Sequence, residues 1–376
     1  MSDKAQINDS EPYDAAVVGA GIMGATTALF LARGGMRCAL IDAGGVCREA
    51  SGVNAGTLTL HMTRAALIPY AMRGWEMWKN APNWLGSDPG VTMTDGLSLA
   101  FTAQEAALLE EGVEARRAQG APIEIVTASR AREIEPGLTD KVRLVAHCPM
   151  DGHVTANLTG MAYRRALTEA GVRLYENAPV TGIEADNGGF RLTMAGVAPR
   201  ARRLVLASGV WLEEMLAWFG SRIRIKALVN QLIVTERLRP VMRSVLGIAS
   251  GFLSLKQFAN GTVLIGGGWQ GKGDRVRRVT EIVPDNLIGN LRLARYAVPA
   301  LAETRIVRSW LGFEAETDDA LPIVGPLSGI PEAYVIGCVH SGYTSGPYFG
   351  RLLAQTILGH EPEMPLFDAG RLLASP

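Results

Sequence analysis

The sequence is poor in cysteine and has no excess charge of either sign. Its four cysteines, in a chain of 376 residues, show no C-x-x-C spacing, which argues against a zinc or iron–sulfur site. Lysine and arginine together number 37, as do aspartate and glutamate, so no net charge attracts nucleic acid or an anionic membrane surface. We therefore expect no metal site and no nucleic-acid partner.

The amino-terminal segment and the hydropathy pattern lack targeting features as well. Residues 1–12 (MSDKAQINDSEP) show no basic segment followed by an apolar one, as a secretory signal would. No apolar run reaches the length of about eighteen residues that a transmembrane helix requires. We expect a cytoplasmic protein with reduced cysteines, no transmembrane segment and a disordered tail at 1–10.

What the sequence does contain begins with a glycine-rich turn. Segment 14–18 (DAAVV) predicts a buried strand, residues 19–24 (GAGIMG) match G-x-G-x-x-G, and an apolar run at helical spacing follows. A second predicted strand, 37–41, ends on Asp42. A lone G-x-G-x-x-G is a weak signal, but strand, glycine turn, helix, strand and acid in this order indicate a dinucleotide-binding unit.

Each part of this unit has a physical task. Gly19 permits the tight turn, Gly21 lets a pyrophosphate approach the backbone, and Gly24 lets the helix pack closely on the strand. The N-terminus of the following helix offers free N–H groups and the positive end of its dipole to the phosphates.

The acid and the loop behind the second strand bear on which dinucleotide is bound. Asp42 can accept hydrogen bonds from a ribose 2′-hydroxyl, and its charge disfavours a 2′-phosphate. The small-residue loop at 48–56 (REASGVNAG) suits close passage of the backbone along a cofactor, whereas NAD enzymes usually continue there with another helix and strand. An ordinary Gly/Asn turn is the alternative for this loop.

These motifs, with several later ones, resemble the D-amino-acid oxidase-like family of FAD-dependent oxidoreductases. The later segments are DGHV at 151–154, LVLASGVW at 204–211, LPIVG at 321–325, and a strand, glycine-rich turn and helix at 335–353. The family includes glycine oxidase, monomeric sarcosine oxidase and the flavin subunits of heteromeric sarcosine, proline, opine and hydrogen-cyanide-forming enzymes. The resemblance covers nearly the whole chain and implies FAD as cofactor.

The resemblance implies an α/β fold with two domains. A Rossmann-like FAD-binding domain would be discontinuous and consist of 11–88, 146–220 and 318–376. An antiparallel-sheet substrate domain, inserted between these pieces, would consist of 89–145 and 221–317.

The residue patterns themselves predict further elements. Segment 221–270 is rich in alternating strand patterns, which favours the antiparallel sheet. The other predicted elements are helices at 64–80, 103–119 and 157–170, a hairpin of 180–185 with 190–194, a strand at 334–339, a loop at 340–347 and a helix at 348–358.

The family's FAD contacts are carried over where this chain matches the motifs. The residues expected to bind FAD are Gly19, Gly21, Ile22, Met23, Gly24, Asp42, Ala43, Ser51, Asn54, Ala55, Gly56, Val180, Ser208, Gly209, Gly342, Tyr343 and Thr344. Sarcosine oxidases attach flavin through a cysteine where Phe313 or Glu314 stands here, so we expect non-covalent FAD. The helix after the loop at 340–347 would point its positive end toward the flavin, stabilising negative charge on reduction.

The expected substrate pocket departs from the family. D-amino-acid and glycine oxidases clamp the substrate carboxylate with an arginine where this chain reads GFEA at 312–315. A lysine of the sarcosine oxidases is matched by Thr344 here, and an arginine by His61. The pocket candidates are therefore His61, Arg64, His340, Tyr343 and Glu314. For His61, Arg64 and Glu314, the structural alternatives are a partly buried histidine, a surface arginine and a local salt bridge.

The oxygen-activating lysine of the sarcosine oxidases has no match either. Val263 occupies the expected position, and Lys272 lies too late in the sequence. This difference favours a dehydrogenase over an oxidase. We expect hydride removal from the carbon beside nitrogen in a secondary amine or imino acid of the opine or N-alkyl-amino-acid type.

The resemblance also bears on partners. Flavin subunits of the heteromeric relatives pass electrons to an accessory chain, in some members with FMN at the interface, so we expect a partner subunit. The alternatives are a stand-alone glycine or D-amino-acid oxidase that releases hydrogen peroxide, a flavin subunit that only relays electrons, and an NAD-dependent dehydrogenase.

Overall fold

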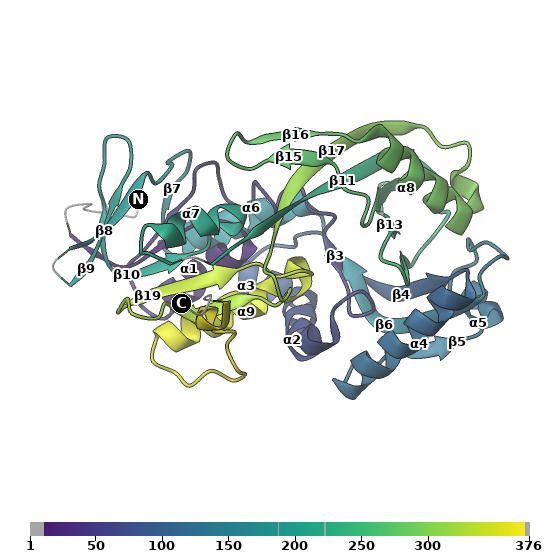
Figure 1. Ribbon diagram of the computed structural model, residues 1–376, viewed down its shortest axis with the longest axis horizontal. Helices are drawn as coiled ribbons and strands as arrows, with labels where there is room; N and C mark the ends of the chain where they lie inside the picture. Colours follow the sequence, from purple (N-terminus) through teal and green to yellow (C-terminus); the bar gives the residue numbers. More distant parts are fainter. Residues whose placement is uncertain (1–10, 187, 222, 373–376) are drawn as a thin grey trace.

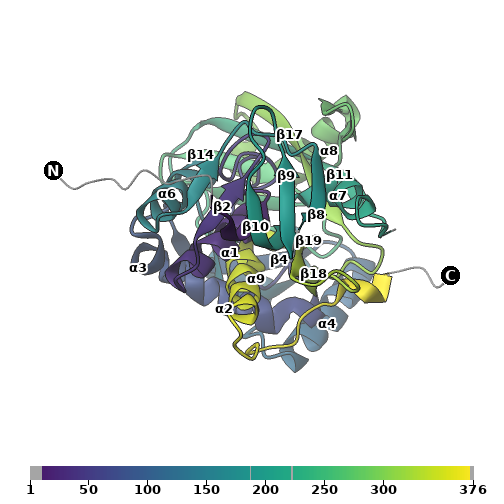
Figure 2. The ribbon, with the colours of Figure 1, turned by 90° about the vertical axis from the view of Figure 1, so that its left-hand side faces the viewer.

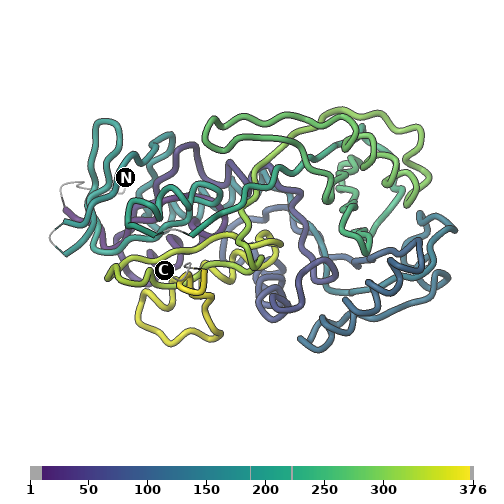
Figure 3. Tube along the Cα trace, in the orientation of Figure 1, coloured from purple at the N-terminus to yellow at the C-terminus, as the bar shows by residue number. Residues whose placement is uncertain are grey.

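The computed structural model describes residues 11–186, 188–221 and 223–372. Two sheets, each with its own helices, lie side by side along the long axis of the molecule (Figure 1), which confirms the expected two-domain α/β class. The chain passes between the two lobes several times (Figure 3), so each lobe is built from segments far apart in sequence. The tail expected at 1–10 and Asn187 of the expected hairpin turn lie outside the described residues.

A parallel sheet forms the centre of the first lobe. Its middle strand, β1 (Tyr13–Val18), pairs with β2 (Cys38–Ile41) on one side and with β10 (Arg200–Leu206) on the other. Beyond them, β7 (Arg173–Tyr175) and β19 (Ala333–Gly337) extend the sheet, also in parallel. β1 and β2 are apolar along most of their length because both of their faces are buried.

Antiparallel strands extend this sheet next to β19 and β10. β18 (Ile323–Pro326) pairs with β19, and the hairpin of β8 (Gly182–Asp186) and β9 (Gly189–Thr193) continues from β10. The hairpin expected at 180–194 is thus present, with strand bounds shifted by one or two residues.

The helices of the first lobe pack on one another beside the sheet. The main ones are α1 (Ile22–Arg33), α2 (Ile68–Lys79), α6 (Ala156–Glu169) and α9 (Gly342–Ile357). Figure 2 shows α1, α9 and α2 following one another away from the strands. Their shared core joins alternate side chains of β1 and β2 to Trp78, Tyr343 and Phe349.

Helix α9 corrects the expectation of a loop at 340–347. It begins at Gly342, directly after Ser341 in the left-handed region (φ 62°), and contains Pro347. A proline lacks the N–H group that would bond the carbonyl four residues earlier. Here that carbonyl, Tyr343 O, accepts a hydrogen bond from Trp78 Nε1 of α2 at 2.6 Å. A tertiary partner therefore satisfies the group that proline leaves unpaired, and the helix continues.

The second lobe is built on a mixed sheet. In spatial order its strands are β17 (Ile306–Glu316), β11 (Lys226–Arg237), β14 (Thr262–Gly266), β13 (Ser254–Gln257), β12 (Val245–Ile248), β4 (Thr92–Ala100), β6 (Leu144–His153) and β3 (Thr57–Leu58), with β5 (Glu124–Val126) beside β6. All of these pairs are antiparallel except β12 with β4, which is parallel. The expected antiparallel sheet is therefore present, with one parallel junction between β12 and β4.

Two segments assigned by sequence to the FAD-binding domain belong to this second sheet. The expected boundary at residue 146 falls inside β6, whose pairing with β4 continues as far as His153. β3 pairs with the end of the same strand. One continuous strand, β6, thus carries the chain from the second sheet to the first lobe, and residue 146 lies within this strand.

Helices cover the second lobe, and short elements fill the connections. The helices are α4 (Ala103–Ala118), α5 (Ala128–Ile134) and α8 (Pro284–Ala297). The short elements are η1 (Ala65–Leu67), α3 (Ala81–Leu85), η2 (Gly209–Trp211), α7 (Leu212–Ala217), β15 (Lys272–Asp274), β16 (Val279–Glu281), η3 (Pro299–Leu301) and η4 (Ala369–Leu372). Among the described residues, no helix is both long and apolar enough to cross a membrane.

Close packing of α2 on α9 yields a stability prediction. A Cβ at Gly74 would collide with Thr344 O and lie 2.8 Å from Ser345 Cα, so the backbones themselves would have to separate. We expect Gly74→Ala to lower the free energy of unfolding by about 2 kcal/mol, as overpacking does. The measurement is the urea midpoint, followed by tryptophan fluorescence.

Gly160→Ala in α6 is the matched control. A Cβ there would meet its nearest neighbour, Val46 O, at 3.4 Å, which allows the helix preference of alanine to act. We expect this variant to be as stable as the wild type or slightly more stable. Equal midpoints for the two variants would contradict the proposed contact.

Candidate functional site

A cavity of about 670 Å³ lies between the two lobes. Its walls come from the carboxyl end of β1 and the start of α1, from the loop after β2, from β11, β13 and β17, and from the start of α9. Elements of both sheets therefore contribute to one site.

The glycine turn shapes the end of the cavity in the first lobe. Gly19 adopts φ +109°, and a Cβ there would collide with Ala207 of the neighbouring strand segment. A Cβ at Gly24 would collide with Gly19 O, so a larger residue would push α1 off the turn. The glycines thus bring the N-terminus of α1 to the cavity, where its N–H groups can meet phosphate oxygens.

Asp42 holds this turn together from the end of β2. Its Oδ2 accepts the Ala20 N–H and its Oδ1 accepts the Gly44 N–H, each at 2.7 Å. A carboxylate oxygen has a second lone pair, so both oxygens can still accept a hydrogen bond from a sugar hydroxyl. Sequence reasoning predicted a sugar contact for Asp42, which stays a prediction, and the structure adds its role in fixing the two turns.

The loop expected to follow the cofactor folds over the start of α1. Ser51 Oγ accepts the Ile22 N–H at 3.0 Å, and Asn54 Oδ1 accepts the Gly56 N–H at 2.8 Å. Together with the glycine turn and Asp42, this loop forms an elongated polar cradle. Its donors suit a pyrophosphate and its acceptor suits a ribose, so the residues present fit the ADP half of FAD.

Most residues expected to bind FAD line the cavity. These are Gly19, Gly21, Ile22, Met23, Gly24, Asp42, Ala43, Ser51, Asn54, Ala55, Val180, Ser208, Gly209, Gly342 and Tyr343. Gly56 and Thr344 are not lining residues. Thr344 lies behind the wall, where its Oγ1 accepts the Thr59 N–H at 2.9 Å.

Glu314 and His340, both expected in the pocket, lie together in the cavity. His340 Nδ1 is 3.1 Å from Glu314 Oε1, and Asn230 Nδ2 donates to Glu314 Oε2. Burial tends to raise the pKa of Glu314, but His340, Asn230 and the charge of Arg64 outweigh it and leave this pKa below its usual value. The cavity therefore contains an ionised carboxylate at neutral pH.

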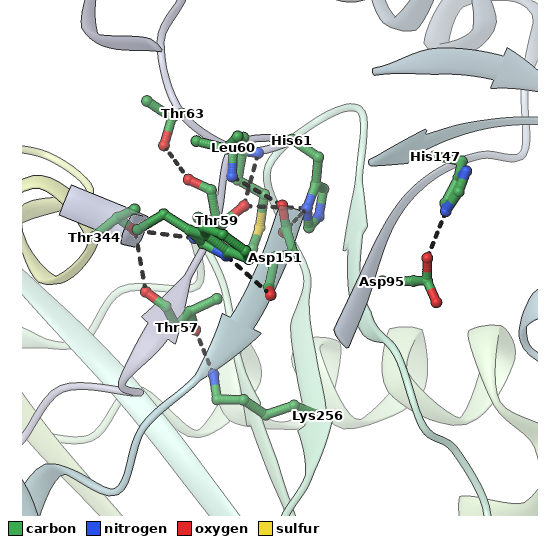
Figure 4. Close-up of polar contacts among 12 residues, drawn as sticks. Thr57, Thr59, Leu60, His61, Thr63, Asp95, His147, Asp151, Lys256 and Thr344 are labelled. Atoms are coloured by element: carbon green, nitrogen blue, oxygen red, sulfur yellow. Dashed lines mark hydrogen bonds and ion pairs between the residues drawn. The ribbon is translucent and has the colours of Figure 1, made fainter. Parts of the chain in front are cut away.

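His61 forms part of the cavity wall, but its polar atoms face inward. The side chain is fully buried, and Nδ1 contacts the carboxylate of Asp151 (Figure 4). Asp151 Oδ1 also accepts the Leu60 N–H at 2.9 Å. His61 Nε2 is also buried and has no hydrogen-bond partner among the described residues.

One pocket candidate lies outside the cavity wall, and another lines the cavity from the core of the first lobe. Arg64 is not a lining residue, and its Nη2 pairs with Glu316 Oε2 at 3.0 Å. The ring of Tyr343 stacks on Trp78 at a centroid distance of 5.5 Å, within the core of the first lobe. Burial raises the pKa of its hydroxyl group, which therefore stays protonated. Tyr343 serves chiefly to hold α9 against α2.

Sequence reasoning missed Lys256 on β13. Its side chain is 1% exposed, and Nζ donates to Thr57 Oγ1, on a residue that lines the cavity (Figure 4). Burial lowers the pKa of Lys256 to about 7. Lys256 lies on the same face of β13 as the cavity residue Ser254, and Leu255 lies on the other face. This alternation is the sequence pattern that places Lys256 on the cavity side of the strand.

Arg116 was missed as well. It lies in the last turn of α4, for which the sequence predicted only a helix at 103–119, and it lines the cavity. No group of three or more His, Cys, Asp or Glu side chains that could hold a metal ion occurs in the described part of the chain.

Known proteins with similar sequences and structures agree with this geometry. An opine oxidase subunit of Agrobacterium tumefaciens (strain Ach5) is 29% identical over 379 residues, which covers 96% of this chain and 98% of the relative. Glycine oxidase of Geobacillus kaustophilus (strain HTA426) is 28% identical over 354 residues, covering 92% of this chain and 93% of the relative.

A solved structure and a family model extend the likeness to the whole fold. The crystal structure of glycine oxidase from Geobacillus kaustophilus has a TM-score of 0.88 at 25% identity, covering 97% of this chain and 99% of that chain. The model of the DAO family, described as FAD dependent oxidoreductase, matches residues 14–356. The chain therefore belongs to the DAO family of FAD-dependent oxidoreductases.

Proposed function

We propose that this chain oxidises the C–N bond of a secondary amine or imino acid of the opine or N-alkyl-amino-acid type. The observation that carries the proposal is one cavity that joins a dinucleotide cradle to the half-buried group of Glu314, His340 and Asn230. The likeness to an opine oxidase subunit that aligns along nearly the whole chain supports this substrate class.

The polar group in the cavity suits an amine. FAD, when bound, supplies the acceptor for the hydride that leaves the carbon beside nitrogen. The ionised Glu314 attracts the ammonium form of the substrate, and His340 beside it can accept a proton. An ammonium group has no lone pair to form the C=N bond, so this proton must leave first. The resulting imine hydrolyses in water without a protein nucleophile.

The start of α9 supports the same chemistry. Gly342 lines the cavity at the first turn of a helix of 16 residues. The positive end of this helix dipole would face the site and stabilise negative charge that develops there.

We propose that the FAD is non-covalent. Phe313 and Glu314 line the cavity where sarcosine oxidases have their attachment cysteine. Cys338 also lines the cavity, but burial raises the pKa of its thiol to about 12. A thiol that stays protonated is a poor nucleophile, so it should not attach to the flavin.

We also propose a partner subunit that accepts the electrons, since the opine oxidase relative is itself named as one subunit of an enzyme. An FMN at the interface of the two chains belongs to this proposal. A cytoplasmic location likewise stays a prediction from the sequence.

A stand-alone oxidase that releases hydrogen peroxide is the second candidate, and Lys256 favours it. A cation beside the cavity can stabilise the charge that develops when oxygen is reduced. Lys256 occupies a different strand position from the one at which the resemblance placed the oxygen-activating lysine, and it contacts the cavity through Thr57.

The proposed reaction predicts flavin bleaching by amines. Under anaerobic conditions, secondary amino acids and opines should reduce the bound flavin of the purified holoprotein, followed by absorbance in a stopped-flow instrument. Glu314→Gln removes the carboxylate charge from the cavity and should weaken substrate binding about 10- to 100-fold, as for a charged hydrogen bond. Glu316→Gln, on the same strand, is the control. A colourless protein, or one that no amine reduces, would rule out the proposal.

Asp42 provides a prediction for cofactor binding. Acid precipitation should release the yellow colour into the supernatant, because the flavin is non-covalent. Titration of the resulting apoprotein with FAD should show affinity lower by about 1–3 kcal/mol for Asp42→Asn, which loses the charge on the sugar acceptor.

The control for Asp42→Asn is Asp88→Asn. Asp88 Oδ1 accepts two backbone N–H groups in an exposed turn away from the cavity, so it reproduces the turn role without the sugar contact. Colour retained in the acid pellet, or equal FAD affinity in the two variants, would contradict the assignment.

The electron acceptor separates the two candidate functions. We expect the substrate-reduced holoprotein to be reoxidised more slowly by dissolved oxygen than by an artificial dye, as for a dehydrogenase. Reoxidation by oxygen as fast as turnover would identify an oxidase instead.

In that case Lys256→Met should slow the oxygen reaction about 100-fold. The wild-type rate should also fall above pH 7, where a lysine with pKa about 7 loses its charge.

A further inference from the structure

Arg116 is a cation in the wall of the cavity that makes no ion pair with any described residue. Its Nε donates to Thr63 O at 2.7 Å and its Nη1 to Gly112 O at 2.8 Å. Both acceptors are backbone carbonyls, which fix the direction of the side chain but do not neutralise it. An arginine has five N–H donors, so one on Nη1 and two on Nη2 stay available.

The charge of Asp151 acts on Arg116 through space, but Asp151 does not bind Arg116. Burial lowers the pKa of Arg116, and the charge of Asp151 partly opposes this shift through space. The oxygens of Asp151 contact Leu60 N and His61 Nδ1, and no ion pair joins them to Arg116. The half-buried guanidinium group therefore lacks a counter-ion of its own within the described ranges.

Helix α4 is shaped to present this group to the cavity. Leu108, Gly112 and Arg116 follow one another at four-residue spacing, and all three line the cavity. A Cβ at Gly112 would lie 2.6 Å from Arg116 Nη1, so the glycine leaves room for the guanidinium group. The N–H groups that remain available on Nη1 and Nη2 match the two oxygens of a carboxylate.

We infer that Arg116 binds a carboxylate of the amine substrate and so restricts the chain to amines that carry an acid group. The inference rests on the proposed amine oxidation. Glu314 attracts the nitrogen and Arg116 the carboxylate, so one cavity offers opposite charges to the opposite charges of an amino or imino acid.

The test compares variants at Arg116 with a variant of its exposed neighbour. Arg116→Gln keeps hydrogen-bonding capacity but removes the charge. Arg116→Lys keeps the charge but removes the paired N–H donors of the guanidinium group. Arg117→Gln removes a charge from the same turn outside the cavity. Unchanged thermal unfolding and an unchanged flavin spectrum would show that each variant is folded and loaded with FAD.

Ligand binding is measured without turnover. Benzoate is titrated into the oxidised holoprotein and followed by the change in flavin absorbance, with benzamide as the uncharged comparison. We expect Arg116→Gln to raise the dissociation constant of benzoate about 10- to 100-fold, Arg116→Lys to raise it less, and Arg117→Gln to leave it within about twofold. Benzamide should bind all variants alike. Failure of benzoate to bind the wild type, or equal binding by all variants, would overturn the inference.

Turnover separates this inference from the proposed function. The amino acid that reduces the flavin most rapidly is compared with its primary amide, which has the same C–N bond but lacks the carboxylate. If both reduce the wild type with equal affinity, the inference fails while amine oxidation stands. If no amine reduces the flavin but benzoate binding depends on Arg116, the proposed function fails while the carboxylate site stands.

Discussion

The buried carboxylate of Asp151 is the interaction on which the cavity wall depends. Its side chain accepts from Leu60 N and contacts His61 Nδ1, while its backbone carbonyl accepts from Trp75 Nε1 at 3.2 Å. A carboxylate removed from water costs several kcal/mol unless its partners are complete, so these contacts constrain one another. They tie β6, the segment after β3, and α2 together where the two lobes meet. Asp151 makes these contacts and no ion pair with Arg116.

The placement of α9 follows from a second tertiary constraint. Trp78 supplies the hydrogen-bond donor that Pro347 lacks, and Gly74 lets the backbone of α2 approach Thr344 closely. As a result the helix can begin at Gly342, at the wall of the cavity, instead of several residues later. Packing between two helices therefore sets the position of a dipole at the candidate active site.

The ionisable groups around the cavity lie in contrasting environments. Glu314 is kept ionised by His340 and Asn230, whereas Lys256 is buried with a hydroxyl group as its partner and a pKa lowered to about 7. Burial of such groups opposes folding, and their collection in one cavity is what a site for a charged substrate and cofactor requires. Both lobes contribute, because β17 supplies Glu314 and the segment before α9 supplies His340.

The sequence by itself determined the local features. The strand, glycine turn, helix and acid through Asp42 are adjacent in the chain, and α4 begins with a capping box between Thr102 and Glu105 that is complete within four residues. The start of α9, the extent of β6 beyond residue 146, and the approach of Lys256 and Arg116 to the cavity were decided only by the tertiary structure. In each of these cases the deciding contact comes from a segment distant in sequence, and neither periodicity nor spacing encodes which distant partner will satisfy a buried group.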